Sequence, residues 1–179
     1  MANRQSLKDL QVRLAERLTA ARTEAATASW LAVEASGQQY LIPLVQSGEI
    51  FPWTSLQVVP YTKPWYVGVA SLRGGLHGVV DLGALSMHMS AAPAGRVADR
   101  VTSESRLVSL HAALGINSVL WIDRLLGLRN PSMFTAVSEP ANNAHAWFAR
   151  RLTDTQGREW QELNLQALAT DSEFLAIAA

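Results

Sequence analysis

The side chains best suited to chemistry in this sequence are four histidines and a Met-His-Met triplet. The histidines are His77, His88, His111 and His145. None of them stands in the His-Glu-x-x-His spacing that places two zinc ligands on one face of a helix. Met87-His88-Met89 offers thioether and imidazole ligands that suit copper, but it lacks a fourth donor and a rigid frame. The sequence therefore predicts no metal site, and His77 and His111 are interpreted as strand residues.

The sequence also lacks the common signatures of catalysis. It has no Gly-x-Ser-x-Gly elbow and no Walker loop, and Arg73-Gly74-Gly75 stands at a predicted hairpin bend, not at a helix N-terminus. Asp81 and Asp123 could be imagined as paired carboxylates, but each begins a Leu-rich segment where Asp is a common capping residue. The absence of Cys excludes disulfides and thiol chemistry. We predict no catalytic residue, no cofactor and no enzymatic activity.

Arg73 is the side chain that best fits a role in binding. Gly74-Gly75 suits the positive φ angles of a two-residue hairpin turn between two segments of alternating polarity. In that register Arg73 faces Leu76, and Ser71 faces Gly78. Because Ser71 and Gly78 are both small, they leave a shallow depression beside the guanidinium where another chain can approach.

The chemistry of arginine supports this role without deciding it. Side chains alternate along a strand. The residues expected on one face are Val67, Val69, Ser71 and Arg73. A guanidinium makes several directed hydrogen bonds while its stem packs on apolar neighbours. The alternative is an ordinary surface ion pair with Glu49, and the spacing alone does not choose between the two.

Length and composition limit the class of protein. A chain of 179 residues with 49% hydrophobic residues fits one domain, or two small lobes that share a core, and folding at this length buries roughly 70% of the unfolded surface. Lys plus Arg and Asp plus Glu both number 15, whereas a nucleic-acid-binding protein usually carries a basic excess. We find no secretory signal and no apolar run of about 18 residues. We therefore expect a soluble, cytoplasmic protein that neither binds nucleic acid nor inserts directly into a membrane.

Residues 1–28 are predicted to form an N-terminal amphipathic helix, running from about residue 7 to residue 26. Ser6 begins a pattern close to a capping box, and apolar residues then recur at helical spacing. They are Leu7, Leu10, Leu14, Leu18 and Ala21. Such a stripe either docks on the protein's own core or binds a partner, and the sequence leaves both open.

After this helix the hydrophobic period changes to two, which indicates β-strands. Residues 30–34 and 40–45 form a predicted hairpin around Gly37-Gln38, and residues 66–72 and 76–82 form a second one. The later elements are a loop at 86–104, strands at 106–112 and 117–122, a helical turn at 123–128, strands at 147–152 and 159–165, and a helix at 166–179.

A weak internal repeat organises these elements. Residues 37–44 resemble residues 115–122 in pattern, and residues 81–85 resemble residues 164–168. Two small antiparallel barrels account for the repeat, because closing a sheet protects its edges. Within a domain at 29–179 we expect lobe 1 at about 29–90 and lobe 2 at about 105–168, with the C-terminal helix packing back.

Charge is sparse in the first lobe. Between residues 25 and 95 the charged side chains are Glu34, Glu49, Lys63, Arg73 and Asp81. The solvent-facing surface of a monomer normally carries more charge. Either other parts of the chain cover this lobe, or part of it is a surface for a partner.

Three segments resemble the CheW-like family of bacterial chemotaxis adaptors. Residues 68–74, Gly-Val-Ala-Ser-Leu-Arg-Gly, followed by Val79-Val80-Asp81-Leu82, are similar to its Gly-Val-x-Asn-Leu-Arg-Gly signature and the Asp-Leu that follows. Residues 40–44 with Glu49-Ile50 resemble its first hairpin, and residues 119–127 resemble a stretch of its second lobe. The resemblance runs from about residue 30 to residue 168.

The resemblance implies a fold and a set of partners. The fold is mainly β, with two five-stranded antiparallel SH3-like barrels, an N-terminal α-helix and a short C-terminal helix. The partners are the cytoplasmic tip of a methyl-accepting chemoreceptor and the regulatory domain of a CheA-type histidine kinase, within receptor arrays at the membrane. Lys63-Pro64-Trp65 and the N-terminal helix look more like PilI-type members, which serve twitching motility by type IV pili.

The resemblance also implies which residues contact a partner. Receptor contact in the family falls in the groove between the lobes and involves the Arg of the signature. The corresponding residues here are Glu49, Gly68, Ser71, Arg73, Gly74 and Leu107. Ser71 replaces the usual Asn, Gly78 replaces a common Pro, and Ser47-Gly48 stands where Val and a polar residue are expected. These departures affect the receptor interface and leave the fold intact.

A small-ligand-binding or enzymatic β-barrel is the alternative from another class of function. It would use the groove between the lobes, and it requires polar or titratable groups that converge there. The weakly charged first lobe hardly offers them.

Overall fold

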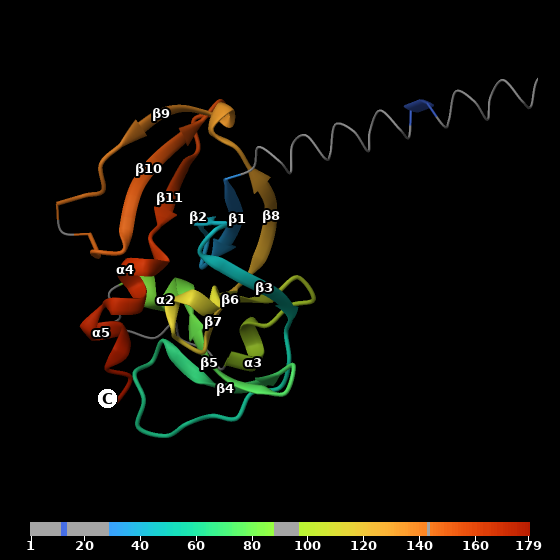
Figure 1. Ribbon diagram of the computed structural model, residues 1–179, viewed down its shortest axis with the longest axis vertical. Coiled ribbons are helices and arrows are strands. Elements are labelled where there is room, and N and C mark those ends of the chain that lie inside the picture. Colours follow the sequence, from blue (N-terminus) through green and yellow to red (C-terminus); the bar gives the residue numbers. More distant parts are fainter. Residues whose placement is uncertain (1–11, 14–28, 88–96, 143) are drawn as a thin grey trace, which may run out of the picture.

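The computed structural model describes residues 12–13, 29–87, 97–142 and 144–179, which form two β-sheets with short helices beside them (Figure 1). The prediction of a mainly β fold with few short helices is confirmed. The predicted N-terminal helix at 7–26 lies almost entirely outside the described residues, as do His88 and Met89.

One sheet has six strands in the order β8-β1-β2-β11-β10-β9. Its strands are β1 (Trp30–Ala35), β2 (Gln38–Pro43), β8 (Arg124–Arg129), β9 (Phe134–Ser138), β10 (Phe148–Asp154) and β11 (Glu159–Leu163). Neighbouring strands run antiparallel except β2 and β11, which are parallel.

The other sheet has five strands in the order β3-β6-β7-β5-β4. Its strands are β3 (Ser47–Pro52), β4 (Tyr66–Leu72), β5 (Gly75–Asp81), β6 (Arg106–Leu110) and β7 (Ser118–Ile122). Here β5 and β7 form the parallel pair. The two predicted five-stranded antiparallel barrels are therefore corrected to mixed sheets of six and five strands.

The sheets do not follow the predicted lobes at 29–90 and 105–168. The six-stranded sheet combines β1 and β2 with β8, β9, β10 and β11, and the five-stranded sheet takes the strands between them. A repeat in sequence shows which segments are alike, but not which strands pair. The two parallel pairs join the halves of the chain, and they carry no local sequence signal.

The first predicted hairpin is confirmed, with its turn one residue earlier than expected. Ala35 pairs with Gln38, so the loop is Ser36-Gly37. Both loop residues have positive φ angles, +50° and +75°, as a tight primed turn requires.

Residues 124–129 form a strand, so the predicted helical turn at 123–128 is wrong. β8 pairs with β1 along its length. A short apolar run such as Leu125-Leu126 fits either a helix or a strand, and only pairing with β1 decides. β3 and β9 were not predicted at all; each lies at the edge of its sheet, where little of the strand is buried.

The short Leu-rich segments of the repeat are helices. They are α2 (Leu82–Ser86) and α4 (Leu165–Thr170), and their caps Asp81 and Asn164 each accept a backbone N–H of the first turn. The expected terminal helix is two pieces, α4 and α5 (Ser172–Leu175), and the expected loop at 86–104 contains α3 (Val97–Arg100). Two 3₁₀ turns, η1 (Ala112–Leu114) and η2 (Pro131–Met133), complete the elements of the described residues.

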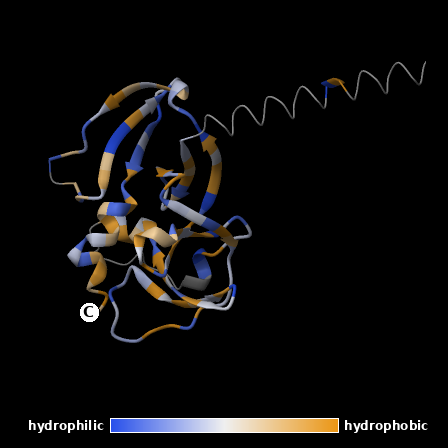
Figure 2. Cartoon of the chain, viewed as in Figure 1, coloured by the Kyte–Doolittle hydropathy of each residue, from blue (hydrophilic) through white to orange (hydrophobic). Residues whose placement is uncertain are grey.

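Buried residues alternate between two interiors along the central strands. In β7, Val119 and Trp121 lie inside the five-stranded sheet, whereas Leu120 and Ile122 belong to a larger core that also receives residues of the other sheet. β1 divides its side chains in the same way, with Trp30 inside the six-stranded sheet. Figure 2 shows hydrophilic residues interspersed with the hydrophobic ones along other parts of the sheets. The molecule thus has one core shared by both sheets and one smaller core inside each.

Candidate protein-interaction site

Arg73 lies at the tip of the β4–β5 hairpin, in the turn itself. Leu72 pairs with Gly75, so the two-residue loop is Arg73-Gly74, with φ angles of +46° and +79°. The loop predicted at Gly74-Gly75 is therefore wrong by one residue. The correction moves Arg73 from the end of a strand to the exposed tip of the hairpin.

The strands leading to this turn pair in a different register from the predicted one, and one residue of the predicted face turns inward. Ser71 pairs with Leu76 and not with Gly78, and both side chains of the pair are exposed. A register shift near the start of β4 turns Val67 inward, where it is buried in the core of the five-stranded sheet. The exposed tip therefore consists of Ser71 and Leu76 beside Arg73.

Arg73 forms the ion pair that the sequence left open. Its Nε lies 2.8 Å from Oε2 of Glu49, and the two side chains are 76% and 52% exposed. The N–H of Glu49 donates a 2.7 Å hydrogen bond to Oγ of Ser109, which ties this part of β3 to β6. An ion pair this exposed contributes at most about 1 kcal/mol. Arg73 thus connects the two edges of the five-stranded sheet while its guanidinium stays accessible.

Two predicted contact residues, Gly68 and Leu107, are buried. Gly68 has a φ of +142°, and a Cβ added to it would lie 2.5 Å from the carbonyl oxygen of Gln57. Leu107 is 0% exposed and pairs with Phe51 inside the five-stranded sheet. Neither residue reaches the surface, so any role of theirs in binding acts through the positions of their neighbours.

Exposed apolar side chains occur in β3, β5 and the β3–β4 connection, and the sequence did not single them out as contacts. Leu76 is 64% exposed, Ile50 beside Glu49 is 43% exposed, and Val58 in the β3–β4 connection is 74% exposed. The alternation along β5 would have identified Leu76, because it follows the turn on the outward face. Apolar residues next to charged ones are the usual composition of a protein–protein interface.

The few charged side chains of residues 29–87 all have partners. The ion pairs are Glu34–Arg124, Glu49–Arg73 and Asp81–Arg100, and Nζ of Lys63 donates to the carbonyl oxygen of Glu173. The strands of this stretch supply residues to all three cores. Its low charge therefore reflects burial for the most part, and the hairpin tip is one of the surfaces of this stretch that stay exposed.

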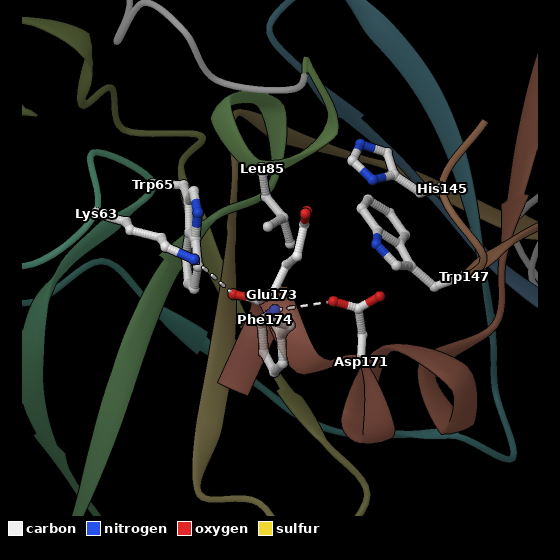
Figure 3. Close-up of a pocket in the computed structure, with 8 residues that line it drawn as sticks. All are labelled: Lys63, Trp65, Leu85, His145, Trp147, Asp171, Glu173 and Phe174. Atoms are coloured by element: carbon white, nitrogen blue, oxygen red, sulfur yellow. Dashed lines mark hydrogen bonds between the residues drawn. The ribbon is translucent and has the colours of Figure 1, made fainter. Parts of the chain in front are cut away.

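A cavity of about 310 Å³ lies where the β3–β4 connection, α2 and α5 meet (Figure 3). Its lining is Lys63, Trp65, Leu85, His145, Trp147, Asp171, Glu173 and Phe174. Lys63 donates to the backbone of Glu173 at 3.1 Å, Asp171 accepts the N–H of Phe174 at 2.9 Å, and Trp65 stacks on Phe174 with 5.7 Å between ring centroids. These contacts fasten α5 to the body of the molecule. Because the polar groups of this cavity hold α5 in place, they do not support the alternative that the protein binds a small ligand.

No group of three His, Cys, Asp or Glu side chains that could hold a metal ion occurs among the described residues. His77 lies in β5 as predicted, whereas His111 follows β6 and accepts a backbone N–H as the cap of η1. Asp81 caps α2 and pairs with Arg100, and Asp123 accepts a backbone N–H from the β1–β2 turn. The two carboxylates therefore have separate structural roles.

Known proteins resemble this chain in sequence pattern and in fold. A family model described as the CheW-like domain matches residues 29–173. Among solved structures, that of the scaffolding protein TtCheW from Thermoanaerobacter tengcongensis is similar, with a TM-score of 0.58 and 15% sequence identity over 76% of this chain and 88% of that chain. No curated protein matches the sequence significantly.

The described helices are all too short or too polar to cross a membrane. The similar solved structure supports the fold alone, because it shares only 15% sequence identity with this chain. The family model covers well over half of the chain and includes both sheets. This chain therefore belongs to the CheW-like domain family, whose members are scaffold proteins and not enzymes.

Proposed function

We propose that this protein is a chemosensory adaptor that couples a methyl-accepting chemoreceptor to a CheA-type histidine kinase. Membership of the CheW-like family supports a role as an adaptor in chemotaxis. The observation that carries the proposal is Arg73, which occupies the Leu-Arg-Gly position of the family signature and is exposed at a hairpin tip.

The surroundings of Arg73 suit a helical partner with a carboxylate. The ion pair with Glu49 is exposed, so a partner's carboxylate can replace Glu49 without unpacking the core. Leu76, which pairs with Ser71 next to the turn, offers exposed apolar area near it. In such an interface the apolar contacts supply affinity, and the charges supply orientation and specificity.

The mechanism of an adaptor of this kind is positional. One surface holds the receptor and another holds the kinase, so that a change in receptor conformation alters the arrangement in which the kinase is held. Coupling of this kind is a difference in affinity between two arrangements and requires no chemistry in the adaptor. The protein would then act in the cytoplasm, at arrays of membrane receptors.

We further propose that the pathway controls twitching by type IV pili. Lys63-Pro64-Trp65 and the amphipathic N-terminal segment resemble PilI-type members of the family. Trp65 is 5% exposed and stacks on Phe174, so this part of the motif has a structural role in the present chain.

Substitution of Arg73 tests the adaptor proposal directly. Arg73→Ala leaves the protein folded, because an ion pair this exposed contributes at most about 1 kcal/mol. We expect it to weaken binding to a receptor's cytoplasmic tip about tenfold or more, measured by titration with the purified tip. Arg151→Ala is the matched control, since Arg151 is exposed on β10 of the other sheet, and it should bind normally. Unchanged binding by Arg73→Ala would remove Arg73 from the interface.

The pathway is tested in the source organism. Loss of the gene should abolish twitching on a surface and leave swimming intact, and the wild-type gene should restore twitching where the Arg73→Ala gene restores it poorly. A swimming defect with normal twitching would assign the protein to the flagellar pathway.

A further inference from the structure

Phe134 at the start of β9 packs on the interior of the six-stranded sheet, but the rest of β9 leaves that interior partly uncovered. Three residues stand directly opposite one another across β11, β10 and β9, namely Trp160, Leu152 and Val137. Directly opposed side chains of paired antiparallel strands share one face, so Val137 points to the same side as the other two. Trp160 and Leu152 are 1% and 3% exposed, whereas Val137 is 59% exposed. This row of apolar side chains is therefore buried in β11 and β10 but exposed to solvent in β9.

The opposite edge of the sheet does not supply that cover. Across β2, β1 and β8 the corresponding row is Leu41, Ala32 and Gly127. Leu41 and Ala32 are fully buried, but Gly127 has no side chain, and a Cβ there would meet only the guanidinium of Arg129, at 3.6 Å. At the β8 edge Leu126 packs against this core, whereas at the β9 edge Val137 stays 59% exposed.

A groove of about 450 Å³ marks this opening. Its lining includes Trp30, Phe134 and Leu152, and the rings of Trp30 and Phe134 meet edge to face at 5.6 Å. Arg150 also lines the groove, and its charge is balanced by Glu162, 2.7 Å away. A segment that binds in this groove therefore needs an apolar face, and it does not need a charged group to pair with Arg150.

The N-terminal segment reaches the body of the protein at this groove. Ser29 lines it, and backbone hydrogen bonds fix Ser29 between β8 and β2: its N–H donates to Arg129 and its carbonyl accepts from Leu44, at 2.9 and 3.0 Å. The eight residue-to-residue steps from Ala21 to Ser29 span up to about 27 Å when extended. The segment can therefore turn back over the groove.

The apolar stripe of the segment has the length that the uncovered region requires. A helix from Leu7 to Ala21 is about 21 Å long. β10 has seven residues, which at about 3.3 Å per residue gives a strand about 23 Å long. One helix with a leucine stripe can therefore cover the open side of the sheet from end to end.

We propose that residues 7–21 dock through their leucine stripe in this groove and cover the interior of the six-stranded sheet at β9. This places the stripe on the protein's own sheet, one of the two alternatives that its sequence allows. The proposal concerns a different sheet from the one that carries Arg73, so it stands independently of the receptor contact.

A single thiol at Val137 tests the proposal in the full chain. The protein has no Cys, so Val137→Cys introduces the only one. If the stripe covers this position about nine-tenths of the time, a maleimide labels it about tenfold more slowly than it labels the same thiol in a Leu10→Asp/Leu14→Asp background. The matched control is Arg13→Asp/Arg17→Asp, which changes the polar face of the same segment and should leave Val137→Cys protected.

Three results would overturn the proposal. Equal labelling rates in the wild-type and Leu→Asp backgrounds would mean that the stripe does not cover β9. Protection that disappears on dilution would assign the cover to a second copy of the chain. Equal loss of protection in the Leu→Asp and Arg→Asp backgrounds would mean that the apolar stripe is not what binds. Circular dichroism of each variant confirms that the sheets are intact, and Ser71→Cys, exposed on the other sheet, should label at one rate in all backgrounds.

Discussion

A buried carboxylate closes the hairpin between β10 and β11. Oδ1 of Asp154 accepts the backbone N–H groups of Gln156 and Arg158, at 2.9 and 3.0 Å. Oδ2 accepts Nε of Arg158 at 2.8 Å and the indole N–H of Trp160 at 3.1 Å. Burial by itself raises the pKa of Asp154, but these four hydrogen bonds to the charged form outweigh burial and hold the pKa at about 2.

Asp154 therefore makes stability depend on pH in the acid range. A carboxylate whose pKa is lower in the folded chain stabilises it above the unfolded pKa, and this stabilisation is lost as the pH falls through the folded pKa. A shift from 3.8 to about 2 corresponds to about 2 kcal/mol. We expect Asp154→Asn to lower the free energy of unfolding by about that amount at pH 7, and by much less at pH 2.

Urea unfolding of the wild-type and variant chains at the two pH values measures this difference. Glu139→Gln is the control, because Glu139 is exposed in the loop after β9, and it should change the free energy by less than about 0.5 kcal/mol at either pH. An effect of Asp154→Asn that is the same at pH 7 and pH 2 would contradict the role assigned to the carboxylate.

Residue chemistry that acts locally could be predicted from the sequence. The sequence predicts that Asp81 is a cap, and Asp81 accepts the N–H of Ala84 at 3.0 Å. The sequence also allows the pairing of Arg73 with Glu49, as one of two possibilities, and the ion pair is present. The burial of Leu107 could not be predicted in the same way, because β6 owes its central place to the order of strands and not to its own composition.

At the scale of elements, the long connection from β3 to β4 is tied to β4 at one point. Gln57 and Val69 exchange two backbone hydrogen bonds of 2.9 Å each. Gly68 lies directly below, with a φ of +142°, and a Cβ there would lie 2.5 Å from the carbonyl oxygen of Gln57. The connection can rest on the edge of the sheet because residue 68 has no side chain.

A comparison of two glycines with positive φ angles separates the effect of this close contact on stability from the effect of the backbone conformation. Gly74 has a φ of +79° and open space around its Cβ position. Gly74→Ala should therefore lower the free energy of unfolding by only about 1 kcal/mol, the energy that a residue with a Cβ loses in the left-handed backbone conformation. Gly68→Ala should cost about 3 kcal/mol, because it also forces Gln57 away from Val69. Urea unfolding measures both losses, and faster amide exchange at Gln57 and Val69 should appear in Gly68→Ala alone. Equal losses for the two variants would show that the contact does not restrict residue 68.

Elements were predictable from the sequence more reliably than their register. Both turns at 36–37 and 73–74 fall one residue before the predicted loop. In the second hairpin either loop keeps the same strand faces together, so hydrophobic pattern cannot choose. Long-range packing accompanies the observed register: the Tyr66 side chain lies against Gly78, where a Cβ would come within 2.8 Å of the Tyr66 hydroxyl oxygen. The local sequence does not predict such a contact.

At the scale of the whole molecule, the two sheets are interlocked rather than joined end to end. The chain enters the six-stranded sheet, builds the whole five-stranded sheet and then returns to the first one (Figure 1). The largest core takes Leu31 and Leu163 from one sheet and Val108 and Leu120 from the other. The internal repeat correctly indicated two similar units, but the units share strands of both chain halves and one core.

This shared core predicts that the sheets unfold together. Leu152→Ala removes a buried side chain from the interior of the six-stranded sheet, and Leu107→Ala does the same in the five-stranded sheet. Each substitution should lower the free energy of unfolding of the whole chain by about 2–5 kcal/mol. Neither sheet can open alone without exposing its side of the common core, so a single transition with an unchanged denaturant slope is expected in both variants.

Far-UV circular dichroism and tryptophan fluorescence during urea unfolding provide the two measurements, since Trp121 and Trp160 are buried in different sheets. Their midpoints should coincide in the wild-type chain and shift by the same amount in each variant. Leu76→Ala is the control, because Leu76 is 64% exposed, and it should leave the midpoint almost unchanged. Separation of the two signals in Leu107→Ala, with one sheet melting before the other, would mean that the shared core does not couple the sheets and that each is stable by itself.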